Sequence, residues 1–152
     1  MSPKIFIAIV VVLVLGIGGF FVYGKYFSPE ARAERHRVAL LTADTSGGAT
    51  PEETMNLFIA ALEAGDVQKA SEYFAYDENL ERNHWKEALQ SIQDGGFLDD
   101  MAKDMKEKRK ADIHSRAETG EFRFFLEQDG ATVAVVILTL NTYSGVWKIE
   151  SF

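Results

Sequence analysis

The stretch from Ala131 to Phe152 reads ATVAVVILTLNTYSGVWKIESF, and it carries the main signal for the fold. Its first part, Ala131–Thr142, is almost continuously apolar, which is typical of a central strand with both faces covered. Ser144-Gly145 supplies a tight turn, and Val146–Phe152 continues as another strand. This stretch therefore predicts a β-hairpin inside an antiparallel sheet.

Two more strands are expected immediately before this hairpin, at Ala111–Ala117 and Glu121–Glu127. Gly120 and Asp129-Gly130 mark the turns around the second of them. Strands joined by such short connections pair in antiparallel fashion. The second half of the chain therefore predicts a meander of four strands.

Helical signals precede the sheet. Thr50-Pro51-Glu52-Glu53 has the residues of a capping box, and apolar residues then recur at helical spacing until Gly65. Asp66 is placed to cap a second helix, and further helices are expected from Leu80 to Gln93 and from Phe97 through Met105. Helices followed by hairpins predict an α+β domain over residues 51–152, with the helices packed on a curved four-stranded antiparallel sheet.

The N-terminal segment Ile5–Tyr23 is predicted to be a transmembrane helix, so residues 1–27 form an anchor. It contains no charged side chain, and at about 1.5 Å per residue it covers about 28 Å, close to the thickness of a bilayer's hydrocarbon core. Basic residues after the segment favour a cytoplasmic domain. The very short N-terminal tail is typical of a signal anchor, and on that ground we expect the domain outside the cytoplasm.

Residues 28–50 are expected to connect the anchor to the domain. Ser28 and Pro29 have the types of an N-cap and a first helical residue, which predicts a juxtamembrane helix over Pro29–Leu41. The following segment Thr42–Thr50, TADTSGGAT, is small and polar. Such a composition predicts a flexible linker.

Composition excludes several classes of function. The 152 residues carry a formal net charge of -7, with a pI near 5.0, so nucleic acid is not an expected partner. There is no cysteine, which excludes disulfides and thiol chemistry. The spacing of histidines and glycines indicates neither a metal site nor a nucleotide cofactor.

Few residues have the types that catalysis needs. His84 lies in a charged stretch, and His114 lies in the first expected strand, where either is more simply a surface histidine. Asp99, Asp100 and Asp104 stand among lysines on an amphipathic helix, where solvation explains them. We therefore expect no catalytic residue.

Six aromatic residues are candidates for lining a pocket that would accept an apolar ligand or a peptide. The alternative is that these residues pack the core, which is the commoner use of aromatics at helical or strand spacing. They are Tyr73, Trp85, Phe97, Phe124, Tyr143 and Trp147.

Three motifs give the domain a resemblance to a known superfamily. Thr50-Pro51-Glu52-Glu53, the phrase Ala60-Ala61-Leu62-Glu63-Ala64-Gly65-Asp66 and the final Gly145-Val146-Trp147-Lys148-Ile149 resemble small membrane-anchored bacterial members of the nuclear transport factor 2-like superfamily. The resemblance implies a cone made by a curved sheet around helices, often with an apolar pocket at its mouth. Members include isomerases, dehydratases and hydrolases as well as adaptors and scaffolds, so the fold does not identify the activity.

The sequence thus predicts a noncatalytic, membrane-tethered binding or scaffold domain with a single membrane pass and an extracytoplasmic C-terminal part. Its expected partners are the membrane and another protein, a peptide or an apolar small molecule, and self-association stays open. One alternative is a small-molecule enzyme of the isomerase or dehydratase type. Another is a subunit of a secretion or conjugation assembly.

Overall fold

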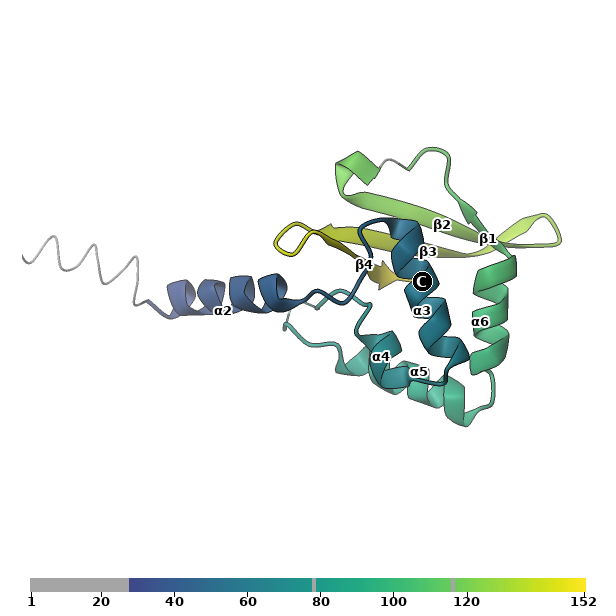
Figure 1. Cartoon of the computed structure of the whole chain (residues 1–152), viewed down its shortest axis with the longest axis horizontal. Helices are drawn as coiled ribbons and strands as arrows, with labels where there is room; N and C mark the ends of the chain where they lie inside the picture. The colour runs from purple at the N-terminus through teal and green to yellow at the C-terminus, as the bar shows by residue number, and fades with distance from the viewer. Residues whose placement is uncertain (1–27, 78, 116) are drawn as a thin grey trace, which may run out of the picture. The chain divides into compact units, whose positions relative to one another are not determined.

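The computed structural model describes residues 28–77, 79–115 and 117–152 (Figure 1). The chain divides between Leu40 and Leu41 into two compact units, and the second unit contains the sheet. The predicted anchor Ile5–Tyr23 lies outside the described residues. Among the helices of the described ranges, none is both long enough and apolar enough to cross a membrane.

The first described helix, α2, spans Pro29–Ala43 and confirms the helix predicted at this position. Its start has the expected cap, because the Ser28 hydroxyl accepts a hydrogen bond from the backbone N–H of Ala31 at 3.2 Å. None of its side chains is buried. Every side chain of the helix is therefore at least partly exposed.

Helix α3, Pro51–Glu63, begins at the predicted capping motif. The Thr50 hydroxyl accepts from the Glu53 N–H at 3.1 Å, and the Glu53 carboxylate accepts from the Ala49 N–H at 2.8 Å. The helix ends at Glu63 with Ala64 as its C-cap, and the next residue, Gly65, has a φ of +66°, which suits glycine. Asp66 then caps the short helix α4, Val67–Ser71, as predicted.

Helix α5, Asn83–Asp94, begins later than predicted, whereas α6, Leu98–Glu107, lies where it was expected. The predicted start of α5 at Leu80 is wrong because Leu80 has a φ of +60°, outside the helical region. The Asp77 carboxylate holds the preceding loop by accepting the N–H groups of Asn79 and Glu81. These local side-chain hydrogen bonds therefore stabilise a loop where the spacing of apolar residues predicts a helix.

The sheet contains β1 (Arg109–Ala111), β2 (Glu121–Gln128), β3 (Ala131–Asn141) and β4 (Val146–Ser151). These strands pair in sequence order, and every pairing is antiparallel. The predicted α+β class and the four-stranded meander are therefore confirmed.

The predicted bounds of the first strand, Ala111–Ala117, are wrong. Only Ala111 of that range lies in β1, which ends there. The Asp112 carboxylate accepts the N–H of His114 at 2.9 Å, which forms a side-chain-closed turn. A short 3-10 helix, Ala117–Thr119, follows this turn.

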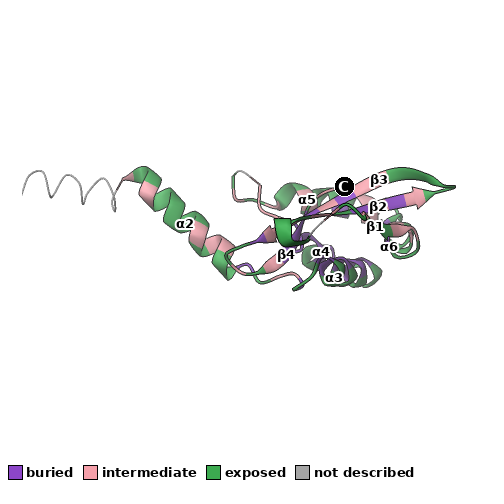
Figure 2. Ribbon diagram, turned by 90° about the horizontal axis from the view of Figure 1, so that it is seen from above, coloured by how far each residue is buried: buried purple, intermediate pink, exposed green. Residues whose placement is uncertain are grey.

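The helices α3 to α6 lie on one face of the sheet, which we call the inner face (Figures 1 and 2). On β3, Val136 and Leu138 point to this face and are fully buried, whereas Val133 remains 59% exposed. The prediction that β3 is covered on both faces is therefore wrong. Its apolar composition reflects an inner face in the core and an outer face that retains apolar side chains.

The core lies between the helices α3 to α6 and the inner face. Phe58 of α3 meets Phe74 edge to face with ring centroids 5.5 Å apart, and Phe74 stacks on Trp85 of α5 at 4.3 Å. Leu138 of β3 and Ile149 of β4 lie opposite each other in the sheet and are fully buried.

The segment between α2 and α3, expected as a flexible linker, instead packs along the edge of β4. The carbonyl of Gly48 accepts the N–H of Trp147 at 2.9 Å, and the Thr54 hydroxyl bridges the Gly48 N–H to the Trp147 carbonyl. A Cβ atom on Gly47 would lie 2.4 Å from the Trp147 carbonyl oxygen. The small residues therefore permit close approach of two backbones.

Candidate functional site

The structure distributes the six candidate aromatic residues over several places. Tyr73, Phe124 and Trp147 are buried in the core. Trp85 lies at its border, in contact with Phe74. Phe97 is 64% exposed beside the start of α6, and Tyr143 is 47% exposed in the turn between β3 and β4. Three of the six therefore have a packing role, and the two exposed rings lie on separate turns.

The candidate acids and bases lie on the surface. His84 Nδ1 is 3.9 Å from Asp77 Oδ2, beyond hydrogen-bond distance, and half of its side chain is exposed. Asp104 is ion-paired with Lys108 at 2.7 Å, and Asp99 and Asp100 are exposed in the first turn of α6. In residues 28–77, 79–115 and 117–152, no group of three histidine or carboxylate side chains is arranged to hold a metal ion.

His114 contributes to a polar hollow of about 370 Å³ at the turn between β1 and β2, together with Asp112, Ser115, Thr119, Glu121 and Arg123. Arg123 Nε donates to Glu121 at 2.9 Å, so the guanidinium charge already has a partner. The Ser115 hydroxyl accepts the Arg123 backbone N–H at 3.0 Å. These bonds shape the turn and leave His114 at its rim.

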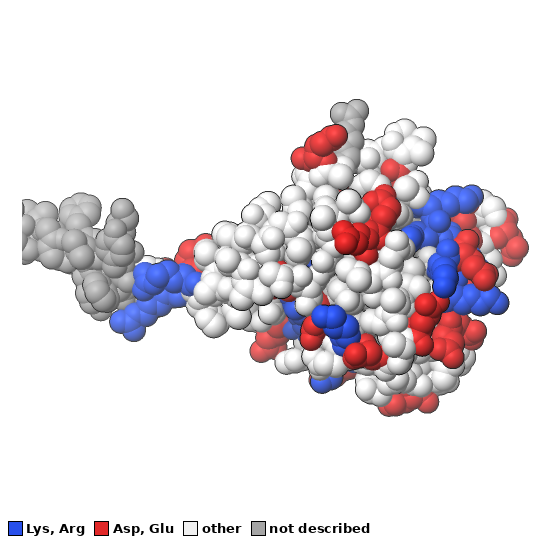
Figure 3. All heavy atoms as spheres, in the orientation of Figure 1, with Lys and Arg blue, Asp and Glu red and all other residues white. Residues whose placement is uncertain are grey.

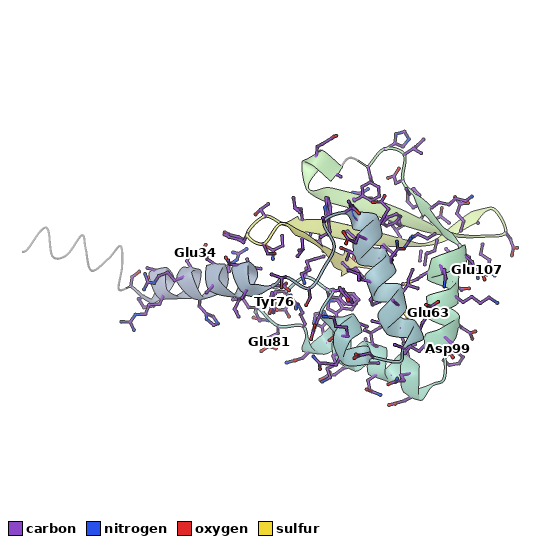
Figure 4. All side chains as sticks on the ribbon, in the orientation of Figure 1. Glu34, Glu63, Tyr76, Glu81, Asp99 and Glu107 are labelled. Carbon is purple, nitrogen blue, oxygen red and sulfur yellow. The ribbon has the colours of Figure 1, made fainter. Side chains whose placement is uncertain are left out.

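A second hollow, of about 400 Å³, lies between α3 and α6, where Figure 4 shows Glu63, Asp99 and Glu107. The ammonium of Lys106 lies 2.8 Å from Glu63 across it. Figure 3 shows basic and acidic side chains side by side over this part of the surface. Mixed charges in a shallow hollow provide no single-sign field that would select an anion or a cation.

The most buried charges of the described residues lie at the edge of the sheet, and no local sequence pattern predicts them. Lys148 of β4 is only 1% exposed, and its ammonium is 2.6 Å from the Asp44 carboxylate and 2.8 Å from the Glu72 carbonyl. It also donates to the Ser46 carbonyl. Asp44 is paired on its other oxygen with Arg82, which stacks on Tyr76 at 3.7 Å.

The charge cluster formed by Asp44, Lys148 and Arg82 surrounds a lysine whose pKa is changed. Burial lowers the pKa of Lys148 to about 8, the hydrogen bond that its ammonium donates to Asp44 opposes this shift, and the positive charge of Arg82 adds to it. A lysine with a lowered pKa can serve as a base or a nucleophile. Here the three bonds to protein oxygens use all three ammonium protons, so the group holds the 44–46 segment against β4.

The outer face of the sheet carries an apolar strip. Directly paired residues point to the same face, and the pair Phe124 and Val136 is buried on the inner face. The neighbouring pair, Phe125 and Val135, must therefore point outward. Together with Val133 and Ile137, it forms what we call the outer strip.

Charged side chains flank the outer strip. Lys110 pairs with Phe125 across β1 and β2 and is ion-paired with Glu127, while Arg123 pairs with Ile137 across β2 and β3. The far end of the same face is covered, because Asn141 donates to the Leu41 carbonyl at 2.8 Å. Apolar side chains surrounded by polar residues are typical of protein-contact surfaces.

Comparisons of the chain with protein-family models, with curated proteins and with solved structures find no match.

Proposed function

We propose that this chain is a noncatalytic binding or scaffold domain that is tethered to a membrane and contacts another protein through its outer strip. The observation that supports this most directly is the distribution of apolar side chains. Three of the six rings that would line an internal pocket, Tyr73, Phe124 and Trp147, are buried in the core, whereas Val133 of the outer strip is 59% exposed. Phe125, Val135 and Ile137 are partly exposed beside it.

Three further parts of the proposal come from the sequence. The uncharged segment Ile5–Tyr23 supports a single-pass anchor, and the short tail before it supports an extracytoplasmic domain. The resemblance to the nuclear transport factor 2-like superfamily supports a curved, cone-like form of the α+β domain. The noncatalytic role is supported by surface histidines and by a buried lysine whose protons are all bonded.

Photocrosslinking on the full chain in its membrane tests the contact surface. A benzophenone amino acid at Ile137 should give a discrete adduct, and the same group at the exposed Lys86 of α5 should not. In the Ile137-labelled chain, Val135→Glu should abolish the adduct, because burying an unpaired carboxylate in an interface is unfavourable. The matched charge change Lys86→Glu should leave it intact. Equal adducts from both positions, or no effect of Val135→Glu, would refute this surface.

A topology reporter tests the orientation separately. An enzyme that is active only outside the cytoplasm, fused after Phe152, should be active. Activity of a cytoplasm-specific reporter at the same position would place the domain on the other side, as the basic residues after the anchor favour.

A further inference from the structure

Phe152 lies at the surface end of an aromatic cluster. Its ring centroid is 5.4 Å from that of Phe74, 5.6 Å from Trp85 and 6.2 Å from Phe58. These are contact distances for aromatic rings. Phe58 and Phe74 are fully buried, whereas Phe152 is 41% exposed. One ring thus covers three others while its own outer side remains in solvent.

An irregularity in the sheet directs Phe152 inward. Leu138 pairs with Ile149, but the next residue of β3, Ile137, pairs with Ser151, so Glu150 is an extra residue in β4. Simple alternation from the buried Ile149 would point Phe152 to the outer face. Because the bulge inserts one residue, Ser151 is opposite the outward-facing Ile137 and Phe152 turns toward the helices.

We propose that Phe58, Phe74 and Trp85 form a binding site for a planar apolar aromatic ring, and that Phe152 occupies this site until such a ring displaces it. The site is distinct from the outer strip and does not depend on it. Its walls select the ligand class, since stacked and edge-to-face contacts favour a flat ring. The His84 ring, 4.7 Å from Trp85, adds a polar group at the rim.

Displacement of Phe152 would disturb little else. β4 ends at Ser151, so Phe152 lies beyond the strand and its movement leaves the β3–β4 ladder intact. The other three rings are held by α3, by the bridge between Phe74 and Ile149, and by α5. A fixed three-ring site with a movable fourth ring is the arrangement expected of self-occlusion.

Fluorine NMR on the full chain in detergent micelles tests this inference. The chain has two tryptophans, so 5-fluorotryptophan labelling reports on Trp85 at the site and on Trp147 in the core. Phenol is the probe, because it is a small, soluble aromatic ring. We expect phenol to shift the Trp85 resonance of Phe152→Ala at about tenfold lower concentration than in the unmodified chain, since removing Phe152 makes the site permanently available.

Two controls make the outcome decisive. Phe97→Ala removes another exposed ring and should behave like the unmodified chain, and cyclohexanol should shift Trp85 far less than phenol does. An unchanged Trp147 resonance shows that the core of each variant is intact, and Phe152→Leu serves in its place if Phe152→Ala perturbs it. Equal phenol responses with and without Phe152, or no response of Trp85 in the variants, would overturn the inference.

Discussion

The ammonium nitrogen of Lys148 lies 2.6 Å from the carboxylate of Asp44, and 104 positions separate the two residues. Both are almost completely buried. This pair joins the segment that enters the domain to the strand that completes it. Its position explains why the domain includes residues before the predicted start at Pro51.

The first prediction concerns the boundary of the domain. A fragment from Leu41 to Phe152 should unfold cooperatively, and a fragment from Thr50 to Phe152 should be several kcal/mol less stable. The shorter fragment lacks Asp44 and Gly48, which leaves the Lys148 ammonium and the Trp147 N–H without these partners. Urea denaturation followed by circular dichroism measures the difference. Equal midpoints would show that the 44–48 segment contributes no stability.

Removing one partner of the buried pair should be costly. Asp44→Ala leaves both Lys148 and Arg82 uncompensated, and breaking a buried pair in this way costs about 3–5 kcal/mol. Glu87→Ala, on the exposed side of α5, is the matched control and should change the free energy of unfolding by less than about 0.5 kcal/mol. A similar small effect of Asp44→Ala would mean that water replaces the carboxylate.

The pKa of Lys148 predicts a pH dependence with a definite sign. Since the pKa of Lys148 is about 8 in the folded chain and that of an unperturbed lysine is 10.5, the folded state releases the proton first as the pH rises. Stability attributable to Lys148 should therefore rise between pH 8 and 10.5, by roughly 3 kcal/mol in total. The quantity to measure is the unfolding free energy of the unmodified chain minus that of Lys148→Met. A difference that is flat over this range would contradict the lowered pKa.

The two candidate aromatics nearest the C-terminus should differ sharply. Trp147 is buried on the inner face, so Trp147→Ala should cost about 3–5 kcal/mol. Tyr143, which is exposed in the turn before β4, should tolerate alanine with a change of less than about 0.5 kcal/mol. Thermal or chemical unfolding of both variants provides the comparison. If Trp147→Ala abolished binding of a ligand and left the free energy of unfolding unchanged, this ring would have a binding role instead.

The sequence determined those features that depend on neighbouring residues. Thr50 and Glu53 cap the start of α3, and Gly65 lies just after its end. Asp129-Gly130 forms the turn between β2 and β3. Each of these features involves residues within a few positions of one another. Short connections then make the antiparallel order of the sheet almost unavoidable. The apolar residues that recur at helical spacing before Gly65 include Phe58, which is fully buried.

Only the tertiary structure decided the features that depend on distant partners. Local sequence cannot show that Asp44 meets Lys148, that Gly47 admits the backbone of β4, or that an extra residue at Glu150 turns Phe152 inward. It also cannot show which face of β3 the helices cover, because an apolar strand looks the same with one face covered or two. Periodicity shows which side chains share one face of a helix or strand. Burial and pairing depend on which other element packs against that face.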